Sequence, residues 1–168
     1  MRVLGVDPGI ATTGFAVLDR GSSRVTPVSI GVLETDPAKP HAERLADLGR
    51  EIGALIAEHR PEVMAVEKVF FSVNVRTAMA VGQASGAILA ATALAGVPVH
   101  DYTPTEVKLS VAGVGTAPKR QVGAMVAALL GLEAAPRPAD AADACALAIC
   151  HINRSGLQRA LAAQGVGR

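Results

Sequence analysis

The chain has 168 residues, of which 50% are hydrophobic and 18% are charged. This composition excludes an intrinsically disordered protein and fits one domain, which we expect over residues 1–154, with a flexible tail over 155–168. The formal net charge of +1 does not by itself indicate a nucleic-acid partner, and the N-terminus resembles no targeting segment, so we expect a cytoplasmic protein.

The first elements in chain order are short apolar runs separated by turn residues. An apolar run over 3–6 meets the turn sequence Asp7-Pro8-Gly9, and β-branched and aromatic residues resume over 12–18. A third extended run covers 25–33, so the pattern predicts an antiparallel meander of three strands. Asp7 then lies at the rim of a hairpin, either as a functional acid or as a residue that starts the turn by bonding its own backbone.

A helix and a second acid-ended strand follow the meander. From His41 to His59 apolar residues recur at intervals of three and four, which predicts an amphipathic helix that stops before Pro61. The apolar run 63–66 ends in Glu67. A strand reached through a helix is expected to lie parallel to the first strand, which places Glu67 at the same sheet edge as Asp7.

Residues 77–100 form an uncharged run long enough to raise the question of a membrane span. Its polar residues and many alanines make it a poor lipid segment, and we predict a buried helix to about Ala95 and a strand over Val97–Tyr102. Gly82 and Gly86 would allow another backbone to come close. That backbone belongs either to this chain or to a second copy in a homodimer.

Three further helices are predicted towards the C-terminus. Thr103-Pro104 begins a short helix through Val111, because Thr caps helices and Pro fits the first turn. A helix over 118–130 follows, and after a proline-broken loop the last helix covers about 139–153. The chain shows no internal repeat.

Basic and aromatic residues concentrate after Glu67. Between Lys68 and Leu132 bases outnumber acids, so a partly basic face that binds phosphates is possible, although a solvated helix surface is the simpler explanation. Phe70 and Phe71 are half of the four aromatic residues of the chain. Their place just beyond a strand end favours a loop, with a plug in the core as the alternative.

Asp140 and Asp143 lie three residues apart at the start of the last predicted helix, so they share one face. Acids in a first helical turn commonly serve the helix itself by capping free N–H groups. Combined with Asp7 and Glu67, however, they make four carboxylates that would repel one another. Oxygen ligands select Mg²⁺ or Mn²⁺, and two such ions about 3.5–4 Å apart are the usual equipment for phosphodiester cleavage.

Five stretches stand in a fixed order along the chain: LGVDPGIATTG, AVEKVFF followed by Asn74, GQASG, VKLSVAGVG with Lys119, and ADAADACALAICH. Together they closely resemble the RuvC-type Holliday junction endonucleases of the ribonuclease H-like superfamily. The resemblance spans residues 2 to about 151. It implies an α/β fold with a mixed five-stranded sheet flanked by helices, a homodimer, and paired Mg²⁺-dependent nicks across a four-way DNA junction, with 5′-phosphate products. It also implies a partnership with the RuvA–RuvB branch-migration complex.

The same resemblance implies roles for individual residues. The carboxylates that bind two metal ions and catalyse would be Asp7, Glu67, Asp140 and Asp143. The DNA-binding residues would be Phe70, Phe71, Arg76, Lys108, Lys119 and Arg120, with Phe70 stacking at the junction centre. The chain departs from the family at Ser85, where relatives commonly have Arg, and at Lys68, where some have Gln.

Three alternatives stay open from the sequence. The LGVDPG start followed by TTG also resembles the first phosphate loop of the sugar kinase, actin and Hsp70 superfamily, although 168 residues leave no room for that fold's second half. A scaffold of the same fold could bind junctions without cutting them. Ribonuclease H-like nucleases that cut RNA or other branched structures are the third alternative.

Overall fold

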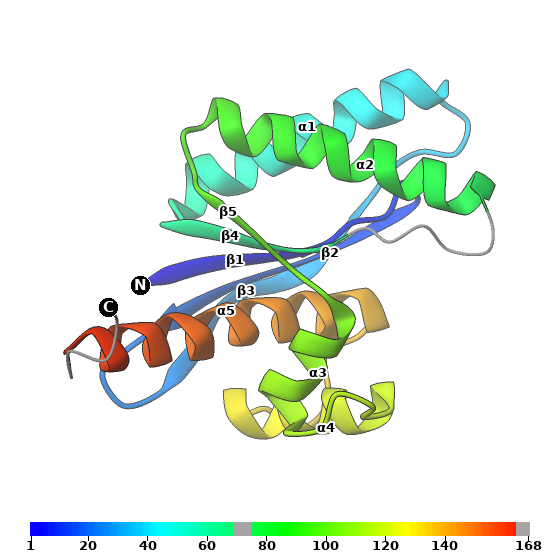
Figure 1. Cartoon of the computed structure of the whole chain (residues 1–168). Coiled ribbons are helices and arrows are strands. Elements are labelled where there is room, and N and C mark those ends of the chain that lie inside the picture. The colour runs from blue at the N-terminus through cyan, green and yellow to red at the C-terminus, as the bar shows by residue number, and fades with distance from the viewer. Residues whose placement is uncertain (69–74, 164–168) are drawn as a thin grey trace.

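The structure is a computed structural model that describes residues 1–68 and 75–163, without the side chains of 75–77 and 158–163. Figure 1 shows one mixed sheet between two layers of helices. The elements in chain order are β1 (Arg2–Asp7), β2 (Thr12–Arg20), β3 (Val25–Glu34), α1 (His41–His59), β4 (Val63–Glu67), α2 (Val75–Leu94), β5 (Val99–Tyr102), α3 (Pro104–Ala112), α4 (Lys119–Leu130) and α5 (Ala139–Ala163).

The sheet has five strands in the order β3-β2-β1-β4-β5. The first three strands pair antiparallel, and β4 and β5 add to β1 in parallel. Both the predicted meander and the predicted parallel return of β4 beside β1 are therefore confirmed. Helix α1 provides the long crossover that a parallel neighbour needs.

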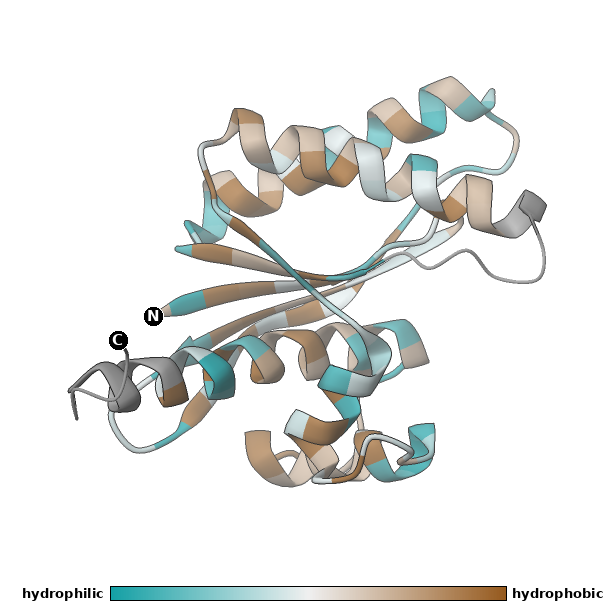
Figure 2. Cartoon of the chain, viewed as in Figure 1, coloured by the Kyte–Doolittle hydropathy of each residue, from teal (hydrophilic) through white to brown (hydrophobic). Residues whose placement is uncertain are grey.

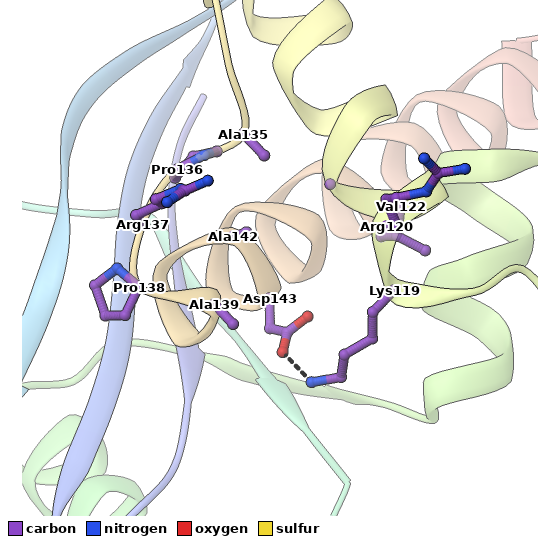
Figure 3. Close-up of a pocket in the computed structure, with 11 residues that line it drawn as sticks. Lys119, Arg120, Val122, Ala135, Pro136, Arg137, Pro138, Ala139, Ala142 and Asp143 are labelled. Carbon is purple, nitrogen blue, oxygen red and sulfur yellow. Dashed lines mark hydrogen bonds and ion pairs between the residues drawn. The ribbon is translucent and has the colours of Figure 1, made fainter.

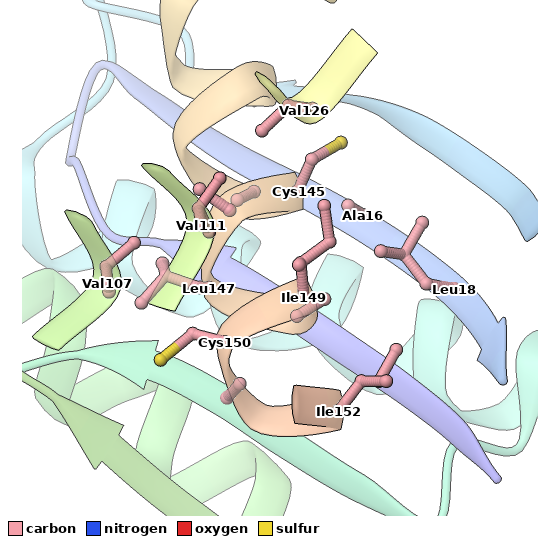
Figure 4. Packing of buried hydrophobic residues seen from close by; sticks show 14 of the residues in the cluster. Ala16, Leu18, Val107, Val111, Val126, Cys145, Leu147, Ile149, Cys150 and Ile152 are labelled. Carbon is pink, nitrogen blue, oxygen red and sulfur yellow. The ribbon is translucent and has the colours of Figure 1, made fainter. Parts of the chain in front are cut away.

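Two hydrophobic clusters fill the space on the two faces of the sheet. Helices α1 and α2 cover one face, and α5 covers the other, with α3 and α4 packed beyond it (Figure 1). Coloured by hydropathy, the strands between these layers are largely hydrophobic (Figure 2). The cluster on the α5 face gathers Val107 and Val111 of α3, Val126 of α4 and the buried side of α5 around Ala16 and Leu18 of β2 (Figure 4).

Two predicted boundaries were wrong. The last helix continues to Ala163, ten residues beyond its predicted end at Asn153. The segment beyond Asn153 is rich in Ala, Leu and Arg, which are strong helix formers, and Gly156 leaves room for the Arg20 guanidinium. Strand β5 begins at Val99 and not at Val97, because Val97 still bonds back to the last turn of α2 through its N–H group.

The predicted burial of α2 is correct for one face of the helix. Ser85 and Ile88 are buried, but Met79 is 59% exposed and Leu94 is 90% exposed. Gly82 and Gly86 lie on the exposed side, and a methyl group added to either would meet no atom within 4 Å. The close backbone contact predicted at these glycines is therefore not made within the described part of this chain.

Within the described residues, none of the helices combines the length and apolar character that crossing a bilayer requires.

Candidate active site

Asp7 and Glu67 lie side by side because β1 and β4 are parallel and in register. Val6 is opposite Val66 in the pairing of the two strands, so the acids that end these strands lie at the same edge of the sheet. Side chains alternate between the two faces of a strand. Val3 and Val63 belong to the cluster on the α5 face, and Asp7 and Glu67 each lie four residues further, so both acids share that face.

Helix α5 brings the second pair of acids to the same edge through two glycines of the sheet. A methyl group on Gly5 would overlap the carbonyl oxygen of Ala144, and one on Gly14 would overlap that of Asp140. Gly14 is also the partner of Asp7 in the β1–β2 pairing. The first turns of α5 therefore rest directly on the strand backbones, which puts Asp140 and Asp143 beside Asp7.

The turn after Asp7 is closed by a buried threonine. The Thr13 hydroxyl donates a hydrogen bond to the Gly9 carbonyl oxygen at 2.7 Å and accepts one from the Gly9 N–H group at 3.2 Å. Thr13 is fully buried. Next to this turn, Arg44 of α1 donates hydrogen bonds to the Thr35 hydroxyl and to the Ile10 carbonyl oxygen. These contacts fix the direction in which the chain leaves β1 and thus the place of Asp7.

The acids open onto a cleft of about 320 Å³ that has basic as well as acidic walls. Asp7, Glu67 and Asp143 line it together with Lys108 of α3 and Lys119 of α4. The Lys119 Nζ atom lies 2.6 Å from an Asp143 carboxylate oxygen, as the dashed line in Figure 3 marks. A cleft lined by both carboxylates and lysines suits a phosphate ester together with a cation.

Burial and the closeness of the other acids raise the proton affinity of Asp7 and Glu67. Burial raises the pKa of Asp7 to about 7, the negative charges of nearby acids add to the rise, and Lys119 opposes it. The acids that contribute are Glu67, Asp143 and Asp140. The pKa of Glu67 is also raised, first by burial and then by Asp143. The site therefore holds more negative charge than its own lysines neutralise, as expected where a cation is to bind.

The donors fit a hard divalent cation in their chemistry, because all of them are carboxylates. The positions of these carboxylates do not yet form a metal site. Among the described residues, no group of three or more His, Cys, Asp or Glu side chains is placed to hold a metal ion. The contact between Asp143 and Lys119 engages one of the four carboxylates.

The predicted DNA-binding residues are distributed unevenly with respect to the cleft. Lys108 and Lys119 line it. Arg120 lines an adjoining pocket and not the cleft itself. Arg76 lies in the first turn of α2, and its side chain is not described; Phe70 and Phe71 lie outside the described residues. Ser85 is 6% exposed, so it does not offer the surface that a phosphate contact would need.

Sequence reasoning missed the residues that hold the acids in place. These residues are Gly5, Gly14 and Thr13, and all three are buried. The two glycines set the position of α5, and the threonine sets the turn after Asp7. Alternation along the strands could have indicated the glycines, since Gly5 occupies the same face as Asp7. Which helix packs there depends on tertiary contacts that the sequence pattern does not contain.

The order and directions of the five strands define a ribonuclease H-like fold, and acids lie at the ends of β1 and β4 and on a helix across them. The family model for crossover junction endodeoxyribonuclease RuvC matches residues 3–151, and the chain therefore belongs to the RuvC family.

The sequences of individual relatives align with this chain over nearly its whole length. The crossover junction endodeoxyribonuclease RuvC of Salinispora arenicola is 52% identical over 164 residues, which is 97% of this chain and 94% of the relative. That of Rhodococcus opacus is 53% identical over 156 residues, 92% of this chain and 82% of the relative. Among solved structures, Thermus thermophilus RuvC in complex with a Holliday junction substrate matches with a TM-score of 0.89 and 39% identity, covering 94% of this chain and 96% of that one.

Proposed function

We propose that this chain is a structure-selective endonuclease that resolves four-way DNA junctions by paired, symmetric nicks, and so acts in recombination and repair. The observation that carries the proposal is the convergence of Asp7, Glu67 and Asp143 with two lysines in one cleft. The solved complex of the Thermus relative with a Holliday junction supports the choice of substrate. The close match to this family along nearly the whole chain favours it over the nucleotide-binding alternative.

The reaction we propose is hydrolysis of a phosphodiester bond to a 5′-phosphate and a 3′-hydroxyl. Asp7, Glu67, Asp140 and Asp143 would hold two Mg²⁺ ions, with Mn²⁺ able to replace them. Such ions supply an activated water and stabilise the leaving oxygen. Lys108, at the wall of the cleft, is suited to attract the phosphate that is to be cut. Lys119 is paired with Asp143 in the structure, and this pair would have to open for the Asp143 carboxylate to bind a metal ion.

Paired nicks require two clefts, and we propose that a homodimer provides them through α2. An uncharged stripe runs along the exposed side of this helix at spacings of three and four. Its members are Met79, Gly82, Gly86, Ala90 and Ala93. A methyl group added to Gly82 or Gly86 would meet no atom within 4 Å in the described chain, and this open space supports a second copy as the partner. Small residues in such a stripe would let two helices approach closely.

The remaining family roles are proposals of the same kind. Phe70 would stack on bases at the junction centre, where an exposed ring can replace a neighbouring base, and Phe71, Arg76 and Arg120 would contact DNA nearby. A cytoplasmic location and an association with the RuvA–RuvB complex rest on family membership alone. Co-purification of this chain with the two proteins on a four-way junction would test the association.

The decisive experiment is cleavage of a synthetic four-way junction with Mg²⁺, mapped on all four strands beside a linear duplex of the same sequence. Nicks should appear at symmetric places on two opposing strands and should be missing from the duplex. Asp7→Asn should abolish the nicks and leave junction binding intact. Binding without cutting by the wild-type chain would favour a scaffold, and equal cutting of RNA hybrids would favour the wider nuclease class.

A further inference from the structure

A second pocket adjoins the carboxylate cleft, and none of the four acids except Asp143 reaches it. Its volume is about 390 Å³, and it shares Lys119, Val122 and Asp143 with the cleft. Its other walls come from the first turns of α4 and α5 and from the loop between these helices. We call it the flanking pocket; Figure 3 shows Arg137 on its loop side and Lys119 and Arg120 on its α4 side.

The walls of the flanking pocket are apolar and its charges are basic. Carbon surfaces of Val122, Ala135, Pro136, Ala139 and Ala142 line it. Its lining contains neither aromatic rings nor side-chain amides, which are the groups that usually stack on bases or read their edges. Such walls can accept the carbon atoms of a deoxyribose, whereas a base would find few partners there.

Two arginines at this pocket are available to an anion. Arg120 and Arg137 are both exposed, and neither forms an ion pair with another described residue. Asp143 is the acid of the lining, and its charge is already engaged by Lys119 at 2.6 Å. A guanidinium presents a planar fork of donors that matches two phosphate oxygens. The pocket therefore combines an apolar wall with unpaired phosphate-binding groups.

We propose that the flanking pocket binds one sugar-phosphate unit of the DNA strand that is being cut, next to the phosphate in the carboxylate cleft, and that Arg137 contacts its phosphate. The proposal rests on the proposed function, because it assumes a DNA strand in the cleft. A strand carries its charges at short, regular intervals, about 3.4 Å apart along the axis of a duplex. A strand whose phosphate lies beside Asp7 and Asp143 thus brings a neighbouring phosphate towards the pocket that shares Asp143.

The test combines an uncharged phosphate analogue with an uncharged side chain. Four-way junctions are made with a single methylphosphonate at each of several positions around the cut, on the cleaved strand and on its neighbour. Dissociation constants are measured without divalent metal for the wild-type chain and for Arg137→Gln. At one position on the cleaved strand the analogue should weaken wild-type binding about tenfold and Arg137→Gln binding less than about twofold.

Salt dependence gives a second measurement. The slope of log affinity against log salt concentration should fall by about 0.9 in Arg137→Gln, the change expected for one lost phosphate contact. Arg24→Gln, at an exposed arginine in the β2–β3 turn, is the matched control and should leave the slope and the methylphosphonate profile unchanged. Arg137→Lys keeps the charge without the fork and should give an intermediate affinity, which separates phosphate binding from loss of folding.

The outcomes distinguish this inference from the proposed function. A wild-type chain that cuts junctions, with additive effects of Arg137→Gln and the analogue at all positions, would overturn the inference alone. Coupling to a phosphate on the neighbouring strand would overturn the assignment to the cleaved strand. A changed sequence preference without coupling would mean that Arg137 reads a base. A wild-type chain that neither binds nor cuts four-way junctions would overturn both proposals.

Discussion

Helices α2 and α5 are both rich in alanine, but their small residues face opposite surroundings. In α5, Ala144 and Ala148 lie against the sheet, where Gly5 lacks the Cβ that would overlap them. In α2, Gly82 and Gly86 face outwards, with open space where a side chain would be. Small residues therefore help to position the acids of α5. In α2 they form a surface that no other part of the described chain covers.

This difference shows that the structural effect of a small residue depends on whether another backbone lies against it. Where a strand backbone lies opposite, as at Gly14, the missing side chain sets the distance between helix and sheet and thereby the place of the acids. Where nothing lies opposite, as at Gly86, glycine lowers the stability of the helix, and no packing contact within the described chain compensates for the loss. The same substitution at the two kinds of site should therefore have opposite effects.

Gly14→Ala should have the largest effect. The added methyl group would overlap the backbone carbonyl of Asp140, which can move away only if α5 lifts off the sheet. We expect the free energy of unfolding to fall by about 3–5 kcal/mol and cutting to fall with it, as measured by denaturant titration and junction cleavage. Gly53→Ala in α1, where an added methyl meets no atom within 4 Å, is the control. A loss below about 1 kcal/mol would contradict the close packing described for α5.

Asp7→Asn should stabilise the fold in a way that depends on pH. The pKa of Asp7 is about 7 in the folded chain against 3.8 for an ordinary aspartate, so between these values the folded state binds more protons than the unfolded state. Wild-type stability then falls as the pH rises through this window, and asparagine removes the fall. In metal-free buffer the variant should nearly equal the wild type at pH 4 and exceed it by about 4 kcal/mol at pH 8.

Denaturant titrations at several pH values measure this difference. Glu51→Gln, at an exposed position of α1, serves as the comparison with one carboxylate removed elsewhere. A stabilisation by Asp7→Asn that is the same at pH 4 and pH 8 would mean that burial and the neighbouring acids do not raise the pKa of Asp7 in the folded chain.

Thr13→Val should have an intermediate effect. Valine keeps the shape but loses the hydroxyl that bonds both backbone groups of Gly9, so two polar groups near Asp7 lose their partner. We expect a loss of about 1–3 kcal/mol and slower cutting, while Thr13→Ser should restore most of the cutting rate. If valine lowered stability without slowing cutting, the turn would not be what positions Asp7.

The parts of the site that follow from chain order could be predicted. Asp7 and Glu67 each end an apolar run, and the parallel return of β4 follows from the long helical crossover, so their meeting at one edge required no knowledge of packing. The spacing of Asp140 and Asp143 likewise placed both on one helix face. These predictions succeed because the periods of strand and helix are local properties of the backbone.

The parts that depend on contacts between distant elements could not be predicted. The ion pair of Lys119 with Asp143 spans 24 positions of the sequence and two helices. The seating of α5 on Gly5 and Gly14 depends on which helix reaches that face. Local patterns also misjudged the end of α5, because Ser155 and Gly156 look like a helix end. The helix nevertheless runs through both residues, and the Ile152 carbonyl oxygen accepts hydrogen bonds from the Arg20 guanidinium and the Ser155 hydroxyl.

Gly86→Ala should have the smallest effect on the monomer, and with the opposite sign to Gly14→Ala. Alanine in an exposed helix is favoured over glycine by up to about 1 kcal/mol, and nothing lies within 4 Å of the added methyl group. If the α2 stripe is the dimer contact, the same methyl group should hold the two helices apart and weaken the dimer several-fold. Sedimentation across a range of protein concentrations measures dimerisation, and denaturation at low concentration measures the stability of the monomer.

Gly53→Ala is the control, and it should give the same kind of helix stabilisation with an unchanged dimer dissociation constant. An unchanged dimer constant in Gly86→Ala as well would remove α2 as the interface and leave its exposed glycines unexplained.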